Sequence, residues 1–283
     1  MTAPQYGKVL REFGIIPKKR LGQHFMIDPA LLRSIATLML PDEGRYVVVE
    51  IGAGIGTLTR ELAGRARRVY ALEMDRDLAP ALETTSKEMP NVQIVWGDAL
   101  EFDLSGGTVA QDNPGEPLAL CGNLPYYVTS EIMYSALVKR AKWSRMGFVV
   151  QEEVGERMAA PPGSRDFGRL SLWCQYRADV TIEKRISKGS FVPRPDVGSC
   201  LVTLRVKSQF PLTPGEEALL DSISRAVFSQ RRKTLQNGLK EVFSDREALL
   251  AALTAAGVDP LRRPEDLSVD DFVRLTKAAS RTY

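Results

Sequence analysis

The chain has 283 residues, of which 44% are hydrophobic and 26% charged, values that are ordinary for a soluble globular protein. This length suits one medium domain plus a small one, and the formal net charge of +3 does not by itself establish a nucleic-acid partner. The first ten residues lack a long apolar core, and no later run approaches the length of a membrane span. We therefore expect a cytoplasmic protein with no membrane partner.

Metal and disulfide chemistry is not expected from the cysteine and histidine content. Cys121, Cys174 and Cys200 form no C-x-x-C pair, and His24 is the single histidine. A lone histidine cannot build a metal cluster, so neither a zinc site nor a disulfide framework is predicted.

The elements alternate through the first three quarters of the chain. Residues 1 to 27 are basic and are expected to be irregular, and Asp28-Pro29 is typical of the N-cap and first residue of a helix, here running to Leu40. Residues 103 to 117 are rich in Gly, Asp, Asn and Pro and predict a surface insertion. The expected strands are 47–51, 69–72, 92–96, 118–121, 146–150, 180–186 and 201–206, and the expected helices are 57 onward, 77–88, 130–140, 152–159 and 169–175.

The strand pattern stops before Pro214. Four helical patterns follow it, at 215–229, 232–242, 246–256 and 268–280. The sequence therefore predicts an α/β domain over residues 1–208 and a small all-α domain over residues 209–283.

A glycine-rich turn follows the first expected strand. The apolar run that begins at Val47 leads into Gly52, Gly54 and Gly56, and the next helix then begins. Such a turn lets a ligand approach backbone N–H groups closely. A dinucleotide fingerprint G-x-G-x-x-G would require glycine at Thr57, so the spacing is more similar to the glycine turn of S-adenosylmethionine-dependent methyltransferases.

Polar residues follow three further strands. Glu73 ends the second strand, where a ribose diol would lie in either kind of cofactor fold, and so does not separate the two. Asp98 follows the third strand and Asn123 the fourth. Because the carboxyl ends of parallel strands meet at one edge of a sheet, these residues and the glycines are expected to converge on one ligand site.

The four residues Asn123-Leu124-Pro125-Tyr126 are similar to the N/D-P-P-Y element of methyltransferases that act on amino groups. An exocyclic adenine amine is a poor nucleophile because its lone pair is delocalised into the ring. The Asn123 side-chain oxygen and the Leu124 carbonyl could accept its N–H groups and localise that pair, with Pro125 stiffening the turn and Tyr126 offering an aromatic face. No general base with a tuned pKa is required.

Three short clusters of basic residues could contact phosphates. They are Lys18 to Arg20, Arg65 to Arg68, and Arg231, Arg232 and Lys233. Three solvated faces are an equally good interpretation until the clusters are shown to lie on one side.

Over nearly its whole length the chain resembles the small-subunit ribosomal RNA adenine dimethyltransferases, also called dimethyladenosine transferases. Ala53 stands where many members carry proline, and the 103–117 insertion is longer than expected. The motifs that carry the resemblance are Leu21-Gly22-Gln23-His24-Phe25, the stretch from Glu50 to Gly56, Asn123 to Tyr126, Phe191-Val192-Pro193-Arg194-Pro195 and Phe228 to Thr234.

The resemblance implies a role for each matched residue. Phe191 would stack on the target base opposite Tyr126, and Asn123 would reach the reacting centre, so the catalytic set is Asn123, Leu124, Pro125, Tyr126 and Phe191. The implied cofactor-binding set is His24 and Met26 flanking the cofactor, Gly52 near its methionine part, Gly54, Glu73 on the ribose, Asp98 with Ala99 at its adenine, and Asn123.

The implied fold is a Rossmann-like S-adenosylmethionine-dependent methyltransferase fold over residues 1–208, with the all-α C-terminal domain assisting RNA binding through Arg231, Arg232 and Lys233. The implied reaction is N6,N6-dimethylation of two adjacent adenosines in small-subunit (16S) ribosomal RNA, by a monomer acting on an assembling 30S particle, with a role in small-subunit biogenesis. Two alternatives stay open: a large-subunit ribosomal RNA adenine methyltransferase, and a non-catalytic RNA-binding assembly factor. Thr57 and the Asn123 motif count against a nicotinamide dehydrogenase.

Overall fold

The computed structural model describes residues 9–138, 142–243 and 245–281. The chain divides into two compact units, the first running up to Gly155 and including Asp179–Val206, and the second made of Glu156–Ala178 together with the chain from Lys207 onward. The boundary expected at residue 208 lies close to the observed change of unit at Lys207. The expected division missed residues 156–178, which group with the C-terminal helices.

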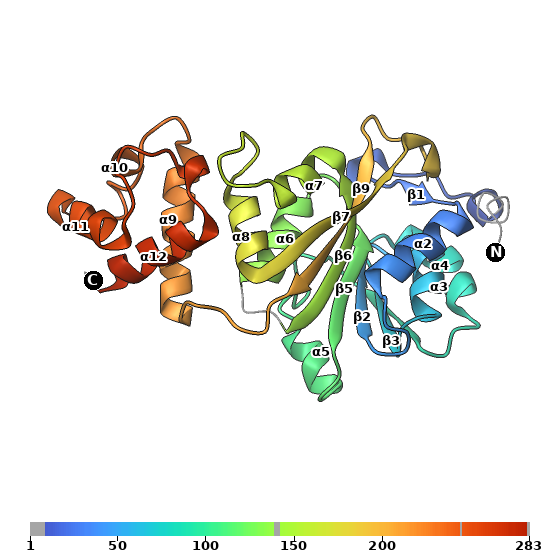
Figure 1. Ribbon diagram of the computed structural model, residues 1–283. Helices are drawn as coiled ribbons and strands as arrows, with labels where there is room; N and C mark the ends of the chain where they lie inside the picture. The colour runs from blue at the N-terminus through green and yellow to red at the C-terminus, as the bar shows by residue number, and fades with distance from the viewer. Residues whose placement is uncertain (1–8, 139–141, 244, 282–283) are drawn as a thin grey trace. The chain divides into compact units, whose positions relative to one another are not determined.

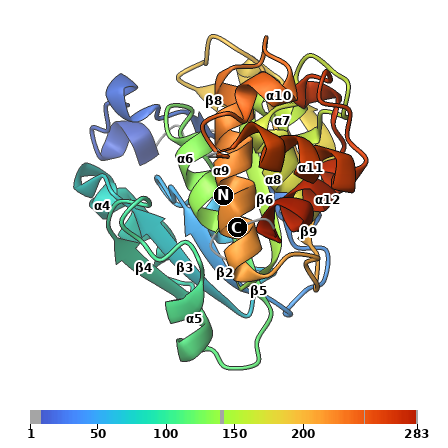
Figure 2. The ribbon, with the colours of Figure 1, turned by 90° about the vertical axis from the view of Figure 1, so that its left-hand side faces the viewer.

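The first unit is built on a seven-stranded sheet with the order β4-β3-β2-β5-β6-β9-β7 (Figure 1). Strands β4, β3, β2, β5 and β6 are parallel to their neighbours, and β9 runs antiparallel to β6. Figure 2 shows β4, β3, β2 and β5 side by side. The strands are β2 Val47–Ile51, β3 Arg68–Glu73, β4 Val92–Trp96, β5 Leu118–Asn123, β6 Trp143–Gln151, β7 Ala178–Ile186 and β9 Ser199–Val206.

Helices connect the parallel strands, as the alternating pattern predicts. Every residue of β2 is buried, which is typical of a central parallel strand covered on both faces. The helices and 3-10 turns of this unit are α2 Pro29–Met39, α3 Thr57–Ala63, η2 Arg76–Leu78, α4 Ala79–Ser86, α5 Gly107–Asp112 and α6 Thr129–Val138, and α7 Glu152–Ala159 crosses its boundary. The expected end of the 130–140 helix lies outside the described residues.

Helix α2 illustrates how the sequence sets an element. The Asp28 side chain accepts hydrogen bonds from two backbone N–H groups of the first turn, and Pro29 occupies the first helical position, as predicted. The buried face of α2 packs in one apolar cluster with residues of α3 and of the central strands. That cluster includes Leu32, Ile35, Met39, Leu58, Leu62, Val48 and Val69.

The strand order changes direction at β2, which is the topological switch point of the sheet. Strands β3 and β4 lie on one side of β2, and β5 and β6 lie on the other. Ile51 is paired with Leu72 of β3 and with Gly122 of β5. The residues that follow these three therefore emerge level with one another at the carboxyl edge, where open α/β sheets bind ligands.

Two stretches expected to be irregular contain regular structure. Within residues 1–27, η1 (Lys19–Leu21) precedes the short strand β1 (Phe25–Met26), which pairs with β8 (Phe191–Val192). Within the 103–117 insertion, the Asp103 carboxylate accepts hydrogen bonds from the backbone of Ser105 and Thr108 at the start of α5. The insertion is tied to the rest of the domain by hydrogen bonds from Trp143 Nε1 to the Leu104 carbonyl at 2.8 Å and from Asn113 Nδ2 to the Tyr70 hydroxyl at 3.0 Å.

The second unit is helical and contains α8 Arg169–Arg177, α9 Pro214–Ser229, α10 Leu235–Gly238, α11 Arg246–Ala256 and α12 Val269–Ser280 (Figure 2). Helix α8 belongs here because the buried Arg177 guanidinium forms a salt bridge with the buried Glu217 of α9, 2.9 Å away. The expected 232–242 helix is reduced to α10. The N–H groups of Leu235 and Gln236 donate to the carbonyls of Arg262 and Pro260 instead of extending a helix.

No helix in the part of the chain that the structure describes is both long enough and apolar enough to cross a lipid bilayer.

Candidate functional site

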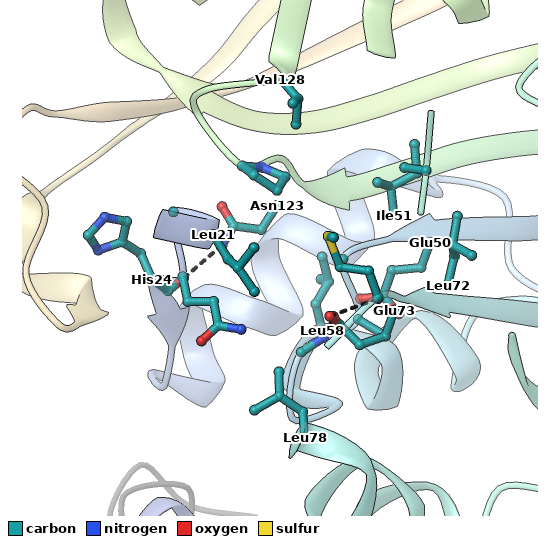
Figure 3. A pocket seen from close by; sticks show the side chains of 18 of the residues that line it. Leu21, His24, Glu50, Ile51, Leu58, Leu72, Glu73, Leu78, Asn123 and Val128 are labelled. Atoms are coloured by element: carbon teal, nitrogen blue, oxygen red, sulfur yellow. Dashed lines mark hydrogen bonds between the residues drawn. The ribbon is translucent and has the colours of Figure 1, made fainter. Parts of the chain in front are cut away.

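A cavity opens at the carboxyl edge of the sheet in the first unit and encloses about 880 Å³, its open mouth included (Figure 3). It is lined by the turn after β2 and by residues that follow β3, β4 and β5, as the topology predicts. A fifth wall comes from the residues before β1. The polar or turn-forming lining residues include Gln23, His24, Glu50, Gly52, Gly54, Glu73, Asp98 and Asn123.

The glycine turn has the backbone that only glycine adopts easily. Gly52 has φ 73° and Gly56 has φ 81°, and a Cβ on Gly56 would lie 2.9 Å from the Thr85 methyl group. The N–H groups of Gly52 and Ala53 both donate to the Leu72 carbonyl, which ties the turn to the end of β3. Ala53 is buried, and a proline in its place could not donate its hydrogen bond.

Glu73 is held rigidly at the cavity wall. Its Oε2 accepts from the Gly54 N–H at 2.8 Å, and its Oε1 accepts from the N–H groups of Met74 and Asp75 at 3.0 and 2.8 Å. Burial raises the pKa of Glu73, while these three hydrogen bonds oppose the rise. The carboxylate therefore has a fixed orientation before any ligand arrives.

Glu50 is a site residue that the sequence analysis did not single out. It lies inside β2, it lines the cavity, and its Oε2 has no hydrogen-bond partner among the described residues. Burial raises the pKa of Glu50 to about 8, with the Thr59 hydroxyl opposing this and Glu73 adding to it. The signal in the sequence was an acidic residue in the middle of the apolar run Val-Val-Val-Glu-Ile.

Asp98 and Ala99 lie where the sequence places them, at the cavity wall after β4. The Asp98 Oδ1 accepts a hydrogen bond from the Leu100 N–H at 2.9 Å, which fixes the turn. Met74, which follows Glu73, also lines the cavity with a side chain that is 43% exposed.

The Asn123 side chain joins β5 to the segment before β1. Its Nδ2 donates to the His24 carbonyl at 2.9 Å, the contact drawn between these residues in Figure 3. This bond occupies the amide nitrogen and so orients the amide oxygen as the remaining acceptor. The Leu124 N–H donates to the Val149 carbonyl at 3.0 Å, which fixes the start of the Asn-Leu-Pro-Tyr turn.

Tyr126 is partly covered. Its hydroxyl lies 2.8 Å from the Ser199 Oγ, its ring stacks on His24 with centroids 5.5 Å apart, and burial raises the pKa of Tyr126. Pro125 and Tyr127 line the cavity, and Tyr127 is 52% exposed. His24 is in turn fixed because its Nδ1 lies 2.8 Å from the Pro193 carbonyl.

The structure brings Met26 to the cavity, but it places Phe191 in the core. Met26 and Phe191 are partners in the β1–β8 ladder, and both belong to the apolar cluster beneath it. The Phe191 side chain is only 2% exposed and is not among the residues that line the cavity. A base can therefore stack on Phe191 only after that ring becomes uncovered.

The three basic residues of the second unit do not behave alike. The Arg231 guanidinium donates to the carbonyls of Arg165 and Phe167, at 2.6 and 2.9 Å, and so ties a loop of its own unit. Arg232 and Lys233 are exposed. Only the latter two are free of that structural role.

The first two basic clusters are partly neutralised. Lys18 lies 2.6 Å from carboxylate oxygens of both Asp75 and Asp77. Arg67 pairs with Glu116 at 3.0 Å, and Arg65 donates to the carbonyls of residues 40 and 41. These pairings favour a structural role for both clusters.

Three features together define a Rossmann-like methyltransferase fold: the glycine turn, the strand order and the cavity at the carboxyl edge of the sheet. A crystal structure of the 23S ribosomal RNA methyltransferase ErmE is similar, with a TM-score of 0.68 and 25% identity over 90% of this chain and 99% of that one. A dimethyladenosine transferase from Plasmodium falciparum has the same fold, with a TM-score of 0.77, 22% identity, and coverage of 92% of this chain and 98% of that chain.

The sequence comparisons are more specific. The family model "Ribosomal RNA adenine dimethylase" matches residues 16–281. A protein from Moorella thermoacetica, "Ribosomal RNA small subunit methyltransferase A", is 37% identical over 273 residues, which cover 95% of this chain and 94% of the relative. The chain belongs to the ribosomal RNA adenine dimethylase family.

Proposed function

We propose that this protein uses S-adenosylmethionine to convert two adjacent adenosines of small-subunit ribosomal RNA to N6,N6-dimethyladenosines. The observation that carries the proposal is the meeting of Glu50, Glu73, Asp98 and the Asn123 amide around one cavity in a member of this family. Small-subunit RNA is preferred over large-subunit RNA because the relative covering 95% of the chain bears the small-subunit name.

The charge of the cavity supports this cofactor over a dinucleotide. Among the described residues that line the cavity are three acidic side chains and neither lysine nor arginine. A dinucleotide would bring an anionic pyrophosphate into these surroundings, whereas the ammonium and sulfonium groups of S-adenosylmethionine outweigh its single carboxylate and leave a net positive charge. The Oε2 atom of Glu50, which has no hydrogen-bond partner among the described residues, could accept a hydrogen bond from the ammonium group of S-adenosylmethionine.

Each lining residue then has an assignable part in holding the cofactor. Glu50 would accept from the ammonium group near Gly52, Glu73 would accept from the ribose hydroxyls, and Asp98 would accept from the adenine amine, with Met26 and Ala99 providing apolar contacts. When bound, S-adenosylmethionine supplies an electrophilic methyl group. The carboxylate of Glu73 needs no reorganisation for this role, since three N–H groups already hold it.

The Asn123 turn would activate the target amine by hydrogen bonding alone. With its nitrogen held by the His24 carbonyl, the Asn123 amide presents its oxygen, and the Leu124 carbonyl is the second proposed acceptor. Two acceptors localise the amine lone pair and stabilise the positive charge that develops as the new N–C bond forms. The proton then leaves to water. After the first transfer one N–H remains, so the second requires room for the first methyl group.

Base stacking is proposed for Tyr126 and Phe191. The target base must leave its stack to reach the cavity. Since His24 covers one face of Tyr126 and Phe191 is buried, the RNA would have to rearrange the β1–β8 region as the base enters.

For the helical unit we propose that Arg232 and Lys233 contact RNA phosphates. The partner would be small-subunit RNA within an assembling 30S particle, bound in the cytoplasm by a monomer. Sedimentation of the protein with and without unmodified small subunits tests whether it binds the particle and whether it is a monomer.

The decisive experiment offers labelled S-adenosylmethionine with unmodified small or large subunits, followed by digestion and mass analysis of the nucleosides. We expect dimethyladenosine in the small-subunit RNA alone, and its formation should be much slower with Asn123→Ala. Label in the large-subunit RNA would favour a 23S ribosomal RNA methyltransferase activity like that for which ErmE is named. Binding without any methylated product would favour an assembly factor.

A further inference from the structure

Residues 18–24, which we call the strap, connect two strand ends that lie on either side of β2. At one end, Lys18 Nζ lies 2.6 Å from Oδ1 of Asp75, two residues after β3. At the other end, the His24 carbonyl accepts from Asn123 at the end of β5. Because β2 lies between β3 and β5, the strap crosses the glycine turn, and its residues 21–24 form one wall of the cavity.

Asp75 makes the tether at the Lys18 end. Its Oδ2 accepts from the Gln23 amide at 2.7 Å, and the Gln23 oxygen accepts from the Lys18 backbone N–H at 2.8 Å, so the three residues form a closed ring of contacts. Burial alone would raise the pKa of Asp75, but the hydrogen bonds from Lys18 and Gln23 hold it below its usual value. Both oxygens of the carboxylate thus contact the strap, while Oδ1 also accepts from the Asp77 N–H at 3.2 Å.

The two ends of the strap are held differently. The His24 end continues into the β1–β8 ladder, whose backbone pairing joins Phe25 to Val192. The Asp75 end is held by side chains, and Lys18 is 27% exposed. Residues before the strap pack in an apolar cluster with Leu78, so loss of the tether would loosen the strap without releasing the chain.

The tether is also coupled to the proposed ribose carboxylate. The Asp75 N–H donates to Oε1 of Glu73 at 2.8 Å, so one short turn fixes both Glu73 and the strap. A cofactor held by Glu73 would lie beneath residues 21–24. Residues 21–24 would be one of the walls that contact it, so loosening the strap would remove contacts that hold the cofactor.

We propose that Asp75 is a positioning residue that holds the strap across the cofactor and, with Lys18 and Gln23, sets the rate of cofactor release. This inference rests on the proposed S-adenosylmethionine site. Loosening the Asp75 end of the strap accelerates dissociation of the cofactor and raises its KM. It leaves kcat at saturating cofactor within about twofold because the His24 end, which orients Asn123, stays anchored by the β1–β8 ladder.

The test compares Lys18→Met, Asp75→Asn and the double variant by stopped-flow measurement of S-adenosylmethionine dissociation. Trp96, next to the lining residue Gly97, supplies the fluorescence signal. Each single variant is expected to release the cofactor about tenfold faster, the effect of losing one hydrogen bond to a charged group. The double variant should be no faster than Asp75→Asn alone, and well short of a hundredfold, because that change already removes the Lys18–Asp75 contact.

Asp77→Asn is the matched control. Asp77 also lies 2.6 Å from Lys18, but its side chain is 76% exposed, and exposed pairs contribute little. The rate of cofactor dissociation from Asp77→Asn should stay within about twofold of wild type. Gln23→Glu places a second carboxylate against Asp75, and it should release the cofactor at least as fast as Lys18→Met. Thermal midpoints verify folding.

The failures are distinguishable. A wild-type dissociation rate in a folded Lys18→Met protein, or strictly multiplicative effects in the double variant, would overturn the role of the strap while leaving the cofactor site intact. A folded wild-type protein that does not bind S-adenosylmethionine would overturn the proposed function and this inference with it.

Discussion

Glu50→Gln should stabilise the cofactor-free protein and weaken cofactor binding at the same time. The rise in the pKa of Glu50 from 4.5 to about 8 corresponds to about 5 kcal/mol, at 1.36 kcal/mol per pKa unit. The folded state holds this proton more tightly than the unfolded state, so the contribution of Glu50 to stability is fully present below pH 4.5 and is lost as the pH rises through about 8. Removing the carboxyl group removes that pH-dependent loss.

The assay is thermal unfolding of both proteins at pH 5 and pH 8.5 without cofactor. The wild-type midpoint should fall between these pH values more than that of Glu50→Gln, with a difference of up to about 4 kcal/mol in unfolding free energy. Calorimetry at pH 8.5 should show Glu50→Gln binding S-adenosylmethionine about 1.5 to 3 kcal/mol more weakly, the value of a hydrogen bond to a charged group. If Glu50 had only a structural role, Glu50→Gln would instead lower the stability of the protein and leave its affinity for S-adenosylmethionine unchanged. That result would refute the reasoning.

Proton release tests the same residue independently. A cation bound beside Glu50 lowers its pKa, so cofactor binding near pH 7 should release a proton from wild type. Calorimetry in two buffers with different ionisation enthalpies measures this release. Glu50→Gln should release fewer protons, and equal release by both proteins would exclude Glu50 as the group that meets the cation.

Asn123→Ala should slow single-turnover methylation by about 10²–10³ at saturating cofactor while affinity for the cofactor changes much less, because one acceptor for the developing charge is lost; unchanged turnover would contradict the site. Glu73→Ala should weaken S-adenosylmethionine binding by about 1.5–3 kcal/mol in calorimetry, and a folded variant with wild-type affinity would refute the ribose assignment. Arg232→Ala with Lys233→Ala should flatten the salt dependence of RNA binding, measured by filter binding. Arg231→Ala should mainly lower the thermal midpoint, since its guanidinium holds two backbone carbonyls.

Local signals predicted much of the fold. Asp28-Pro29 predicted the start of α2, and the helical pattern at 215–229 corresponds to α9, Pro214–Ser229. Contacts between distant residues decided the rest. The placement of α8 in the helical unit depends on the Arg177–Glu217 pair, which joins residues 40 positions apart and leaves no local pattern.

The candidate site was predicted where topology alone determines position, and it was missed where burial decides the role. Strand ends place Glu73, Asp98 and Asn123 at one edge whatever the side chains around them. The positions of Glu50 and Phe191, in contrast, depend on how the side chains around them pack. An acidic residue inside a strand has to be at the cavity for its burial to be tolerable, whereas a phenylalanine in a motif is equally stable in the core. The sequence shows which residue types are present, but only the packing shows that Glu50 reaches the cavity and that Phe191 must be uncovered before it can meet a base.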